Sequence, residues 1–418
     1  MNQHSSSQGN SVGSSQRTVV RAARMLDVRS GELLKNVVVV VEKGRIQSVS
    51  ANMTVQDAQE LDLGEMTLLP GLIDMHVHLS YDWESINAVA RETPADAALR
   101  GARNARATLL AGFTTVRNVG AHDFVDVALM RAVDTGFIDG PRIVPAGHSL
   151  SCTGGYHDFG GGIFPCFAPG LYDLGPESGI ADGPDALRRA VRYQIKYGAK
   201  VIKVVVTAGV LAADGPAGAQ QYSDEELQAI VEETHRHGLK VAAHAHGTAG
   251  ILAALGAGVD SIEHGSMVND EAIHFMKEHG TYLVPTASMF KIFGTNLESL
   301  PAPIRERRTQ FIALAQENHR RAIQAGVKIA FGTDTPVLPH GGNAKEFAVL
   351  VELGMTPLEA IRAATLNATE LLGAEDCGVI EPGRFADMIA VPGDPLMNIQ
   401  MLEDVQFVMQ RGKVVKHS

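Results

Sequence analysis

The stretch "PGLIDMHVHLSYDW", residues 70–83, ends an apolar run with two histidines at alternate positions. In a β-strand, side chains at positions i and i+2 point to the same face, so His76 and His78 would project side by side into one space. Two polar residues at the end of a strand explain the H-x-H pattern equally well when it stands alone. The rest of the chain has to decide between these interpretations.

The composition is that of a globular protein with a large core. Of the 418 residues, 45% are hydrophobic and 20% are charged. The formal net charge of −11 argues against nucleic acid or an anionic membrane as the main partner. No apolar window reaches the length of about 18 residues that a membrane-spanning helix needs. Residues 1–17 are rich in Ser, Gln and Gly, and we expect a disordered tail there rather than a signal peptide.

The three cysteines, Cys152, Cys166 and Cys377, fit a reducing compartment, and the cytoplasm is the expected location. Cys152 and Cys166 share one loop and could pair, although free thiols are favoured.

Both ends of the chain predict short antiparallel strands. Residues 18–65 alternate Val-rich runs with Ser-Gly and Lys-Gly turns. Residues 376–418 show the same alternation of short apolar runs and turns. Neither end could bury a core alone, so we expect the two to fold together as one small β-sandwich.

The middle of the chain, residues 66–375, alternates short apolar runs with helical stretches. Start signals for helices include two capping boxes, Ser223 with Glu226 and Thr356 with Glu359. Eight β-α alternations predict an α/β fold, a parallel (β/α)₈ TIM barrel with its active site at the carboxyl ends of the strands. A doubly wound open sheet is the alternative, but no G-x-G-x-x-G follows a strand. The eight runs are "MTLLPGLIDMHVHL", "FTTVRNVG", "RIVPAG", "VIKVVVT", "VAAHAHG", "DSIEHG", "TYLVPTA" and "IAFGTDT".

Polar residues gather where these runs end. Besides the first pair, the fifth run ends in His244 and His246, the sixth in His264 and the eighth in Asp334. A single histidine at a strand end is more often a satisfied core residue than a ligand. His76, His78, His244 and His264 come from three strands, and four such histidines together with an aspartate favour a metal site. Neutral imidazoles and carboxylates suit Zn²⁺, with Mn²⁺ or Fe²⁺ less favoured.

Lys203 lies inside the β-branched fourth run, where an unpaired ammonium would cost several kcal/mol or more. Its buried stem could carry the amine to an acid at the rim. The histidine cluster offers no such acid, however, and a lysine carbamate would supply two anionic oxygens that bridge two cations. Asp334 would then act as the general base that moves a proton to the leaving nitrogen. The "TDT" motif could instead form an Asx-turn or a helix cap.

Together these residues resemble the amidohydrolase superfamily of metal-dependent hydrolases, through "PGLIDMHVHL", "FGTDT" and "GVIEPGRFADMIAV". The resemblance covers nearly the whole chain after the tail. It implies two divalent metal ions: His76, His78 and Asp334 on the more buried one, His244 and His264 on the more exposed one, and carboxylated Lys203 between them. His246 is not a usual ligand, and we place it behind the ligands or facing the substrate.

Within the superfamily, "GHSLSCTGGYHD", "KVVVTAGV" and "HAHG" resemble the imidazolonepropionase-like and Xaa-Pro dipeptidase-like branch, and more narrowly bacterial amidohydrolases that hydrolyse ochratoxin A. Branch resemblance suggests that Tyr222 polarises the scissile carbonyl. Relatives in this branch are often homo-oligomers, so assembly up to an octamer is expected.

The loop from His148 to about residue 184 is the expected lid or binding loop, because long irregular loops usually have such roles. We expect His148, Tyr156 and His157 to meet the substrate, with His157 on a carboxylate. The aromatic residues could equally pack the loop onto the barrel. The aromatic residues expected to line a site for an apolar side chain are Tyr156, Phe159, Phe164, Phe167 and Tyr172.

The sequence therefore predicts a binuclear amidohydrolase that cleaves N-acyl or N-aroyl amino acids or dipeptides, including ochratoxin A. Xaa-Pro dipeptidase, cyclic-amide hydrolase or lactonase action on the same scaffold is the alternative. Deamination is disfavoured because mononuclear deaminases lack the strand-four lysine. A non-catalytic binding protein is the remote alternative, which the complete ligand set disfavours.

Overall fold

The computed structural model describes residues 17–82, 92–158, 174–209, 217–295, 297–299 and 302–418. In the described part of the chain no helix combines the length and the apolar character that crossing a bilayer requires.

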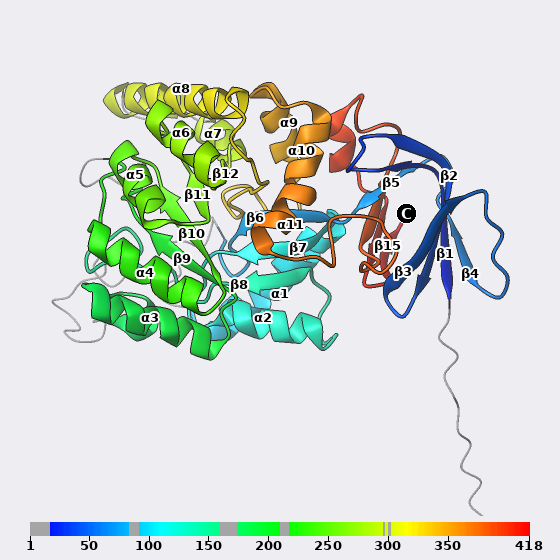
Figure 1. Cartoon of the computed structure of the whole chain (residues 1–418), viewed down its shortest axis with the longest axis horizontal. Coiled ribbons are helices and arrows are strands. Elements are labelled where there is room, and N and C mark those ends of the chain that lie inside the picture. Colours follow the sequence, from blue (N-terminus) through cyan, green and yellow to red (C-terminus); the bar gives the residue numbers. More distant parts are fainter. Residues whose placement is uncertain (1–16, 83–91, 159–173, 210–216, 296, 300–301) are drawn as a thin grey trace, which may run out of the picture.

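Both ends of the chain contribute to one eight-stranded sheet, on the right of Figure 1. Its order is β15-β14-β13-β5-β1-β2-β3, and β4 pairs with β1. The antiparallel pairing of β1 with β2 and of β2 with β3 confirms the predicted N-terminal strands. Strands from both chain ends therefore lie in this one sheet, whereas the β-sandwich remains a prediction. The strands are β1 (Thr18–Leu26), β2 (Leu33–Glu42), β3 (Arg45–Ala51), β4 (Gln59–Asp62), β5 (Thr67–Pro70), β13 (Met388–Val391), β14 (Phe407–Gln410) and β15 (Lys413–His417).

The first apolar run of the middle region is two strands rather than one. β5 pairs with β1 and β13 in the terminal sheet, and β6 (Leu72–Val77) pairs with β7 in another sheet. Between them lies Gly71, whose backbone nitrogen donates to the Asp387 carbonyl at 2.9 Å. A Cβ at this position would lie 2.2 Å from the Thr114 hydroxyl, so the close approach requires glycine.

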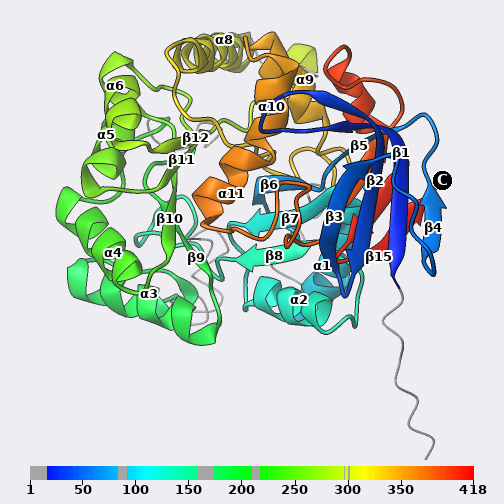
Figure 2. The same cartoon turned by 45° about the vertical axis from the view of Figure 1, so that its right-hand side comes forward.

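The remaining strands form two parallel sheets that the helices cover from outside (Figure 2). One has the order β6-β7-β8 and the other β12-β11-β10-β9. Leu150, after β8, forms a single parallel bridge with Val204 of β9. At the other edges the eighth segment bridges both sheets, through Ile329 to Leu283 of β12 and through Thr335 to Val77 of β6. The α/β class and the parallel β-α alternation are as predicted. The strands are β7 (Phe113–Asn118), β8 (Arg142–Pro145), β9 (Val201–Val205), β10 (Lys240–Ala245), β11 (Ser261–His264) and β12 (Tyr282–Val284).

The eighth run departs from the prediction, because residues 329–335 have only isolated bridges at Ile329 and Thr335 rather than a continuous ladder. Tertiary contacts give the physical reason: the Phe331 nitrogen donates to the Ala363 carbonyl at 3.0 Å instead of to a strand, and Asp334 has a left-handed backbone with φ of 57°. The segment nevertheless runs beside β6, since the Asp334 nitrogen donates to the His76 carbonyl at 2.8 Å.

The helices lie outside the parallel strands, as α3 to α6 do beside β9 to β12 (Figure 1). Both predicted capping boxes are present, at Ser223 before α4 and Thr356 before α10. The helices are α1 (Pro94–Leu110), α2 (Val125–Asp134), α3 (Pro184–Tyr197), α4 (Asp224–Arg236), α5 (Thr248–Ala257), α6 (Asp270–His279), α7 (Ser288–Phe293), α8 (Ala302–Gln324), α9 (Lys345–Glu352), α10 (Pro357–Ala363) and α11 (Leu366–Leu372).

Candidate active site

Two groups of potential metal ligands lie at the carboxyl ends of the parallel strands. In the first group, His76 is the penultimate residue of β6, His78 directly follows this strand, and Asp334 comes from the neighbouring eighth segment. The second group, the three-histidine group, contains His244 of β10, His246 directly after β10, and His264 at the end of β11. Within each group the candidate ligand atoms all lie within 4.8 Å of one another.

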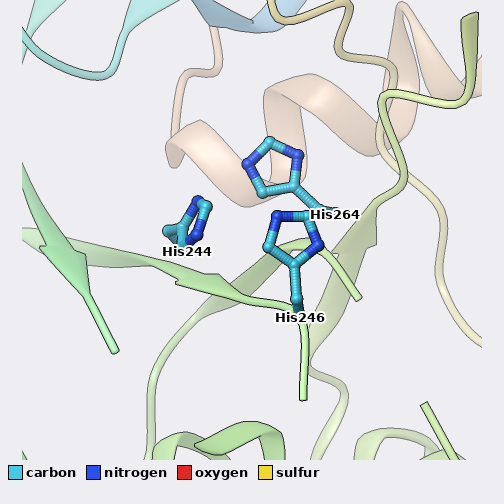
Figure 3. Close-up of side chains that lie close together, drawn as sticks. All are labelled: His244, His246 and His264. Carbon is cyan, nitrogen blue, oxygen red and sulfur yellow. The ribbon is translucent and has the colours of Figure 1, made fainter. Parts of the chain in front are cut away.

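The imidazole rings of the two groups form one continuous cluster. In Figure 3 the His246 and His264 rings lie over one another; their centroids are 4.8 Å apart and their planes differ by 12°. His244 stands edge-on to both rings, at 4.7 and 4.8 Å. His76 connects the groups, because its ring centroid is 4.9 Å from that of His264.

Four of the five rings have one nitrogen engaged away from the cluster. The Nδ1 atoms of His76 and His78 lie 2.7 Å from Glu263 Oε2 and 3.1 Å from the Gly120 carbonyl oxygen. Those of His246 and His264 lie 2.8 Å from the hydroxyls of Ser266 and Thr286. A partner on Nδ1 fixes the ring and leaves Nε2 as the ligand atom, as is usual for metal-binding histidines.

His244 differs, because its Nε2 is buried with no hydrogen-bond partner among the described residues. A buried polar atom without a partner is rare in folded proteins and costs about 1–3 kcal/mol. A bound cation would remove this cost.

The protonation states suit cation binding. Burial lowers the pKa of the His78 and His246 imidazoles to about 3, against the opposing charge of Asp334. Burial would raise the pKa of Asp334, but its bond to His76 and the neighbouring positive charges hold that pKa below its usual value. Neutral imidazoles and an ionised carboxylate are ligands that zinc and similar divalent ions accept. The residues present therefore fit such ions.

Lys203, in β9, points into the cluster, with Nζ 3.5 Å from His76 Nε2. Burial lowers the pKa of this amine to about 8, and the charges of Glu263 and Asp334 partly oppose the shift. The sequence argument that the cluster offers Lys203 no acid was therefore wrong, because two carboxylates act on it.

An ion pair beneath the cluster was missed by the sequence analysis. Arg117, in β7, donates to Glu263 Oε1 at 2.7 Å, to Ser261 Oγ at 3.0 Å and to the Met75 carbonyl at 2.6 Å. Burial would raise the pKa of Glu263, but Arg117 and the bond to His76 hold it at about 2. The available signal was opposite charge inside two buried strands, "FTTVRNVG" and "DSIEHG".

Two candidate ligand residues have unusual backbone conformations. His264 has φ of 69° and Asp334 has φ of 57°, and neither is glycine. Such conformations cost on the order of 1–3 kcal/mol and are common at functional sites, where they aim a side chain that a regular strand could not.

The predicted substrate residues fall into two sets. Tyr156 stacks on His244 with ring centroids 5.4 Å apart, and His157 is 6.3 Å from the same ring, so both flank the three-histidine group. His148 binds Gln194 through Nδ1 and the Asp123 nitrogen through Nε2, and these partners belong to neither group.

Tyr222 is buried in the main core, and its hydroxyl has no hydrogen-bond partner among the described residues. Burial raises its pKa above the usual range, and the charges that act on it are Cys152, Glu226 and Asp182 rather than residues of the cluster. This geometry gives no support to the expected contact with a scissile carbonyl.

Cys152 and Cys377 are free thiols. The remaining predicted loop residues lie outside the described residues: Phe159, Phe164, Cys166, Phe167 and Tyr172.

Known proteins resemble this chain over most of its length. It is 39% identical to the ochratoxinase of Aspergillus niger over 371 residues, which cover 84% of this chain and 75% of that protein. It is 25% identical to the imidazolonepropionase of Deinococcus radiodurans, with 89% of each chain covered. The crystal structure of a Xaa-Pro dipeptidase with methionine bound in its active site superimposes with a TM-score of 0.89 and 36% identity, covering 96% of this chain and all of that one.

These matches confirm the resemblance expected from the motifs, and they identify a hydrolase that acts on amide bonds. The crystal structure of A. niger ochratoxinase superimposes with a TM-score of 0.85 and 34% identity, over 96% of each chain. Residues 67–416 match the amidohydrolase family, so this chain belongs to the amidohydrolase family.

Proposed function

We propose that this chain is a binuclear, zinc-dependent amidohydrolase that cleaves the amide bond of N-acyl or N-aroyl amino acids or dipeptides. The observation that carries the proposal is the pair of adjoining ligand groups, with Lys203 Nζ 3.5 Å from His76 Nε2. His76, His78 and Asp334 would hold one ion, and His244 and His264 the other, with His246 as a further candidate ligand of the second ion. A carboxylated Lys203 between the groups would offer one oxygen to each.

When bound, the ions would lower the pKa of water toward about 7 and polarise the substrate carbonyl. Asp334, ionised and exposed over 18% of its side chain, would accept the proton of the attacking water and pass it to the leaving nitrogen. Tyr156 and His157 flank the three-histidine group, where His157 would hold the substrate carboxylate.

The relatives supply the substrate class. Ochratoxinase and Xaa-Pro dipeptidase support an amide with an amino acid on its nitrogen side, so ochratoxin A, cleaved to ochratoxin alpha and phenylalanine, is the most specific candidate. Xaa-Pro dipeptides are the alternative substrates, and lactones share the same chemistry of attack.

The amidohydrolase neighbours also support a closed (β/α)₈ barrel over residues 66–375, with a β-sandwich from 18–65 and 376–418. Assembly into a homo-oligomer and a cytoplasmic location belong to the proposal as well.

The test is the release of amino acids from a panel of dipeptides, N-acyl amino acids and ochratoxin A, with and without a chelator. We expect turnover that chelation abolishes and added zinc restores. The His244→Asn variant should lose this turnover, whereas His274→Asn, on the exposed side of α6, should keep it. Turnover that resists chelation would contradict the metal mechanism, and no turnover after metal loading would favour a binding protein.

A further inference from the structure

The surroundings of the three-histidine group differ from one side to another. One flank is polar, formed by Tyr156 and His157 beside His244. Another flank is apolar: the ring of Phe311, in α8, lies edge-on to His246 with centroids 6.2 Å apart and planes at 70°. Polar and apolar surfaces therefore adjoin one ligand group.

Phe311 belongs to a separate apolar cluster. It packs on Phe290 of α7, with ring centroids 6.0 Å apart, and the cluster also includes Val337. The Val337 nitrogen donates to the Asp334 carbonyl at 3.0 Å, so the cluster adjoins both ligand groups. Phe311 is only partly buried, so the cluster does not cover this residue completely.

The geometry points to Phe311 as the residue that selects a hydrophobic side chain on the leaving amino acid. This inference rests on the proposed function. An N-acyl amino acid carries its carboxylate and its side chain on the same carbon, so one binding site must offer a polar and an apolar surface within a few ångströms. The three-histidine group has both, with His157 on the polar flank and Phe311 on the apolar flank. Aromatic pairs contribute a factor of about 2 to 13 in affinity beyond the area that they bury, so the preference should be measurable.

The test uses four substrates that combine an acetyl or benzoyl group with alanine or phenylalanine. Phe311→Ala should lower kcat/KM for both phenylalanine substrates about tenfold, equivalent to about 1.4 kcal/mol. Both alanine substrates should stay within about twofold of the wild type. Phe311→Leu, which keeps an apolar side chain, should recover part of the preference. Ile312→Ala is the matched control, because it removes an apolar side chain from the same cluster and helix without a ring contact to the histidines.

The inference would be overturned if Phe311→Ala lowered kcat/KM for the two benzoyl substrates rather than for the two phenylalanine substrates. An equal loss of kcat/KM for all four substrates would overturn it as well. If the wild type cleaves none of them, the proposed function fails while the subsite remains testable by calorimetry of product binding. The subsite then stands if Phe311→Ala weakens the binding of L-phenylalanine about tenfold and leaves that of L-alanine unchanged. It falls if both amino acids are affected equally or neither binds.

Discussion

Replacing Glu263 by glutamine should change two quantities that can be measured separately. One is zinc affinity, which depends on the orientation of His76, and the other is the free energy of unfolding. Glu263 has two contacts of different kinds: Oε1 accepts from Arg117, and Oε2 lies 2.7 Å from His76 Nδ1. All three side chains are buried, with exposures of 0 to 1%. Glutamine keeps the shape but removes the charge, so it cannot serve both partners in the same way.

The magnitudes follow from these contacts. Loss of the partner behind a ligating histidine typically reduces metal affinity 10- to 100-fold, or about 1.4–2.7 kcal/mol. Leaving the Arg117 guanidinium buried without an opposite charge costs about 3–5 kcal/mol of the free energy of unfolding. In Glu263→Met/Arg117→Met neither charge remains unpaired, so stability should recover in part, whereas zinc affinity should stay low because His76 still lacks its acceptor.

Two assays distinguish these effects. Guanidinium unfolding followed by circular dichroism in the presence of a chelator measures the fold, and competition with a chromogenic chelator measures zinc affinity. Glu233→Gln is the control. Glu233, in α4, is 1% exposed, and its Oε1 lies 2.6 Å from Nε of Arg192 in α3, outside the histidine cluster. This variant should lower stability and leave zinc affinity unchanged. Wild-type zinc affinity in Glu263→Gln would refute the reasoning.

The other predictions concern three buried side chains. Lys203→Ala should lower kcat/KM for amide hydrolysis at least 100-fold and reduce the metal content per chain measured by elemental analysis; full activity would remove Lys203 from the mechanism. Tyr222→Phe should leave kcat within about twofold, because the hydroxyl has no partner, while a loss of more than 100-fold would restore its expected role on the carbonyl. Burial raises the pKa of Glu346 from 4.5 to about 8, so the unfolded chain loses this proton first, and the free energy of unfolding should fall as the pH rises from 4.5 to 8. Glu346→Gln should flatten that slope in denaturation at several pH values; an unchanged slope would assign it to other groups.

Much of the site could be predicted from sequence because its residues sit at the ends of apolar runs. His76, His78, His244, His264 and Asp334 follow one rule, that parallel strands present their carboxyl ends at one edge. The family resemblance then gave these residues their roles.

What the sequence could not predict depends on contacts between distant segments. Nothing local to Phe311 shows that its helix returns to His246. Of the two carboxylates that act on Lys203, Glu263 comes from a strand two places further along the chain. The left-handed backbone at Asp334, which interrupts the eighth run, is likewise imposed by tertiary contacts rather than by local propensity.

For Tyr222 and His148 the sequence suggested a contact with the substrate that the observed contacts do not support. Both stand near motifs typical of the branch, yet the structure surrounds Tyr222 with core residues and gives His148 partners on α3 and in the turn before α2. Residue type and position along the chain do not determine side-chain direction in irregular segments, where no periodicity constrains it.

The shared terminal sheet has a consequence for biosynthesis. β5 receives β13 as a neighbour only after residues 388–391 have left the ribosome, although β1 to β5 emerge first. Until then the nascent chain carries an open strand edge bearing Leu68 and Leu69, which are fully buried in the finished molecule. Open apolar edges recruit other chains, so ribosome stalling before residue 388 should release aggregation-prone fragments that chaperones must retain.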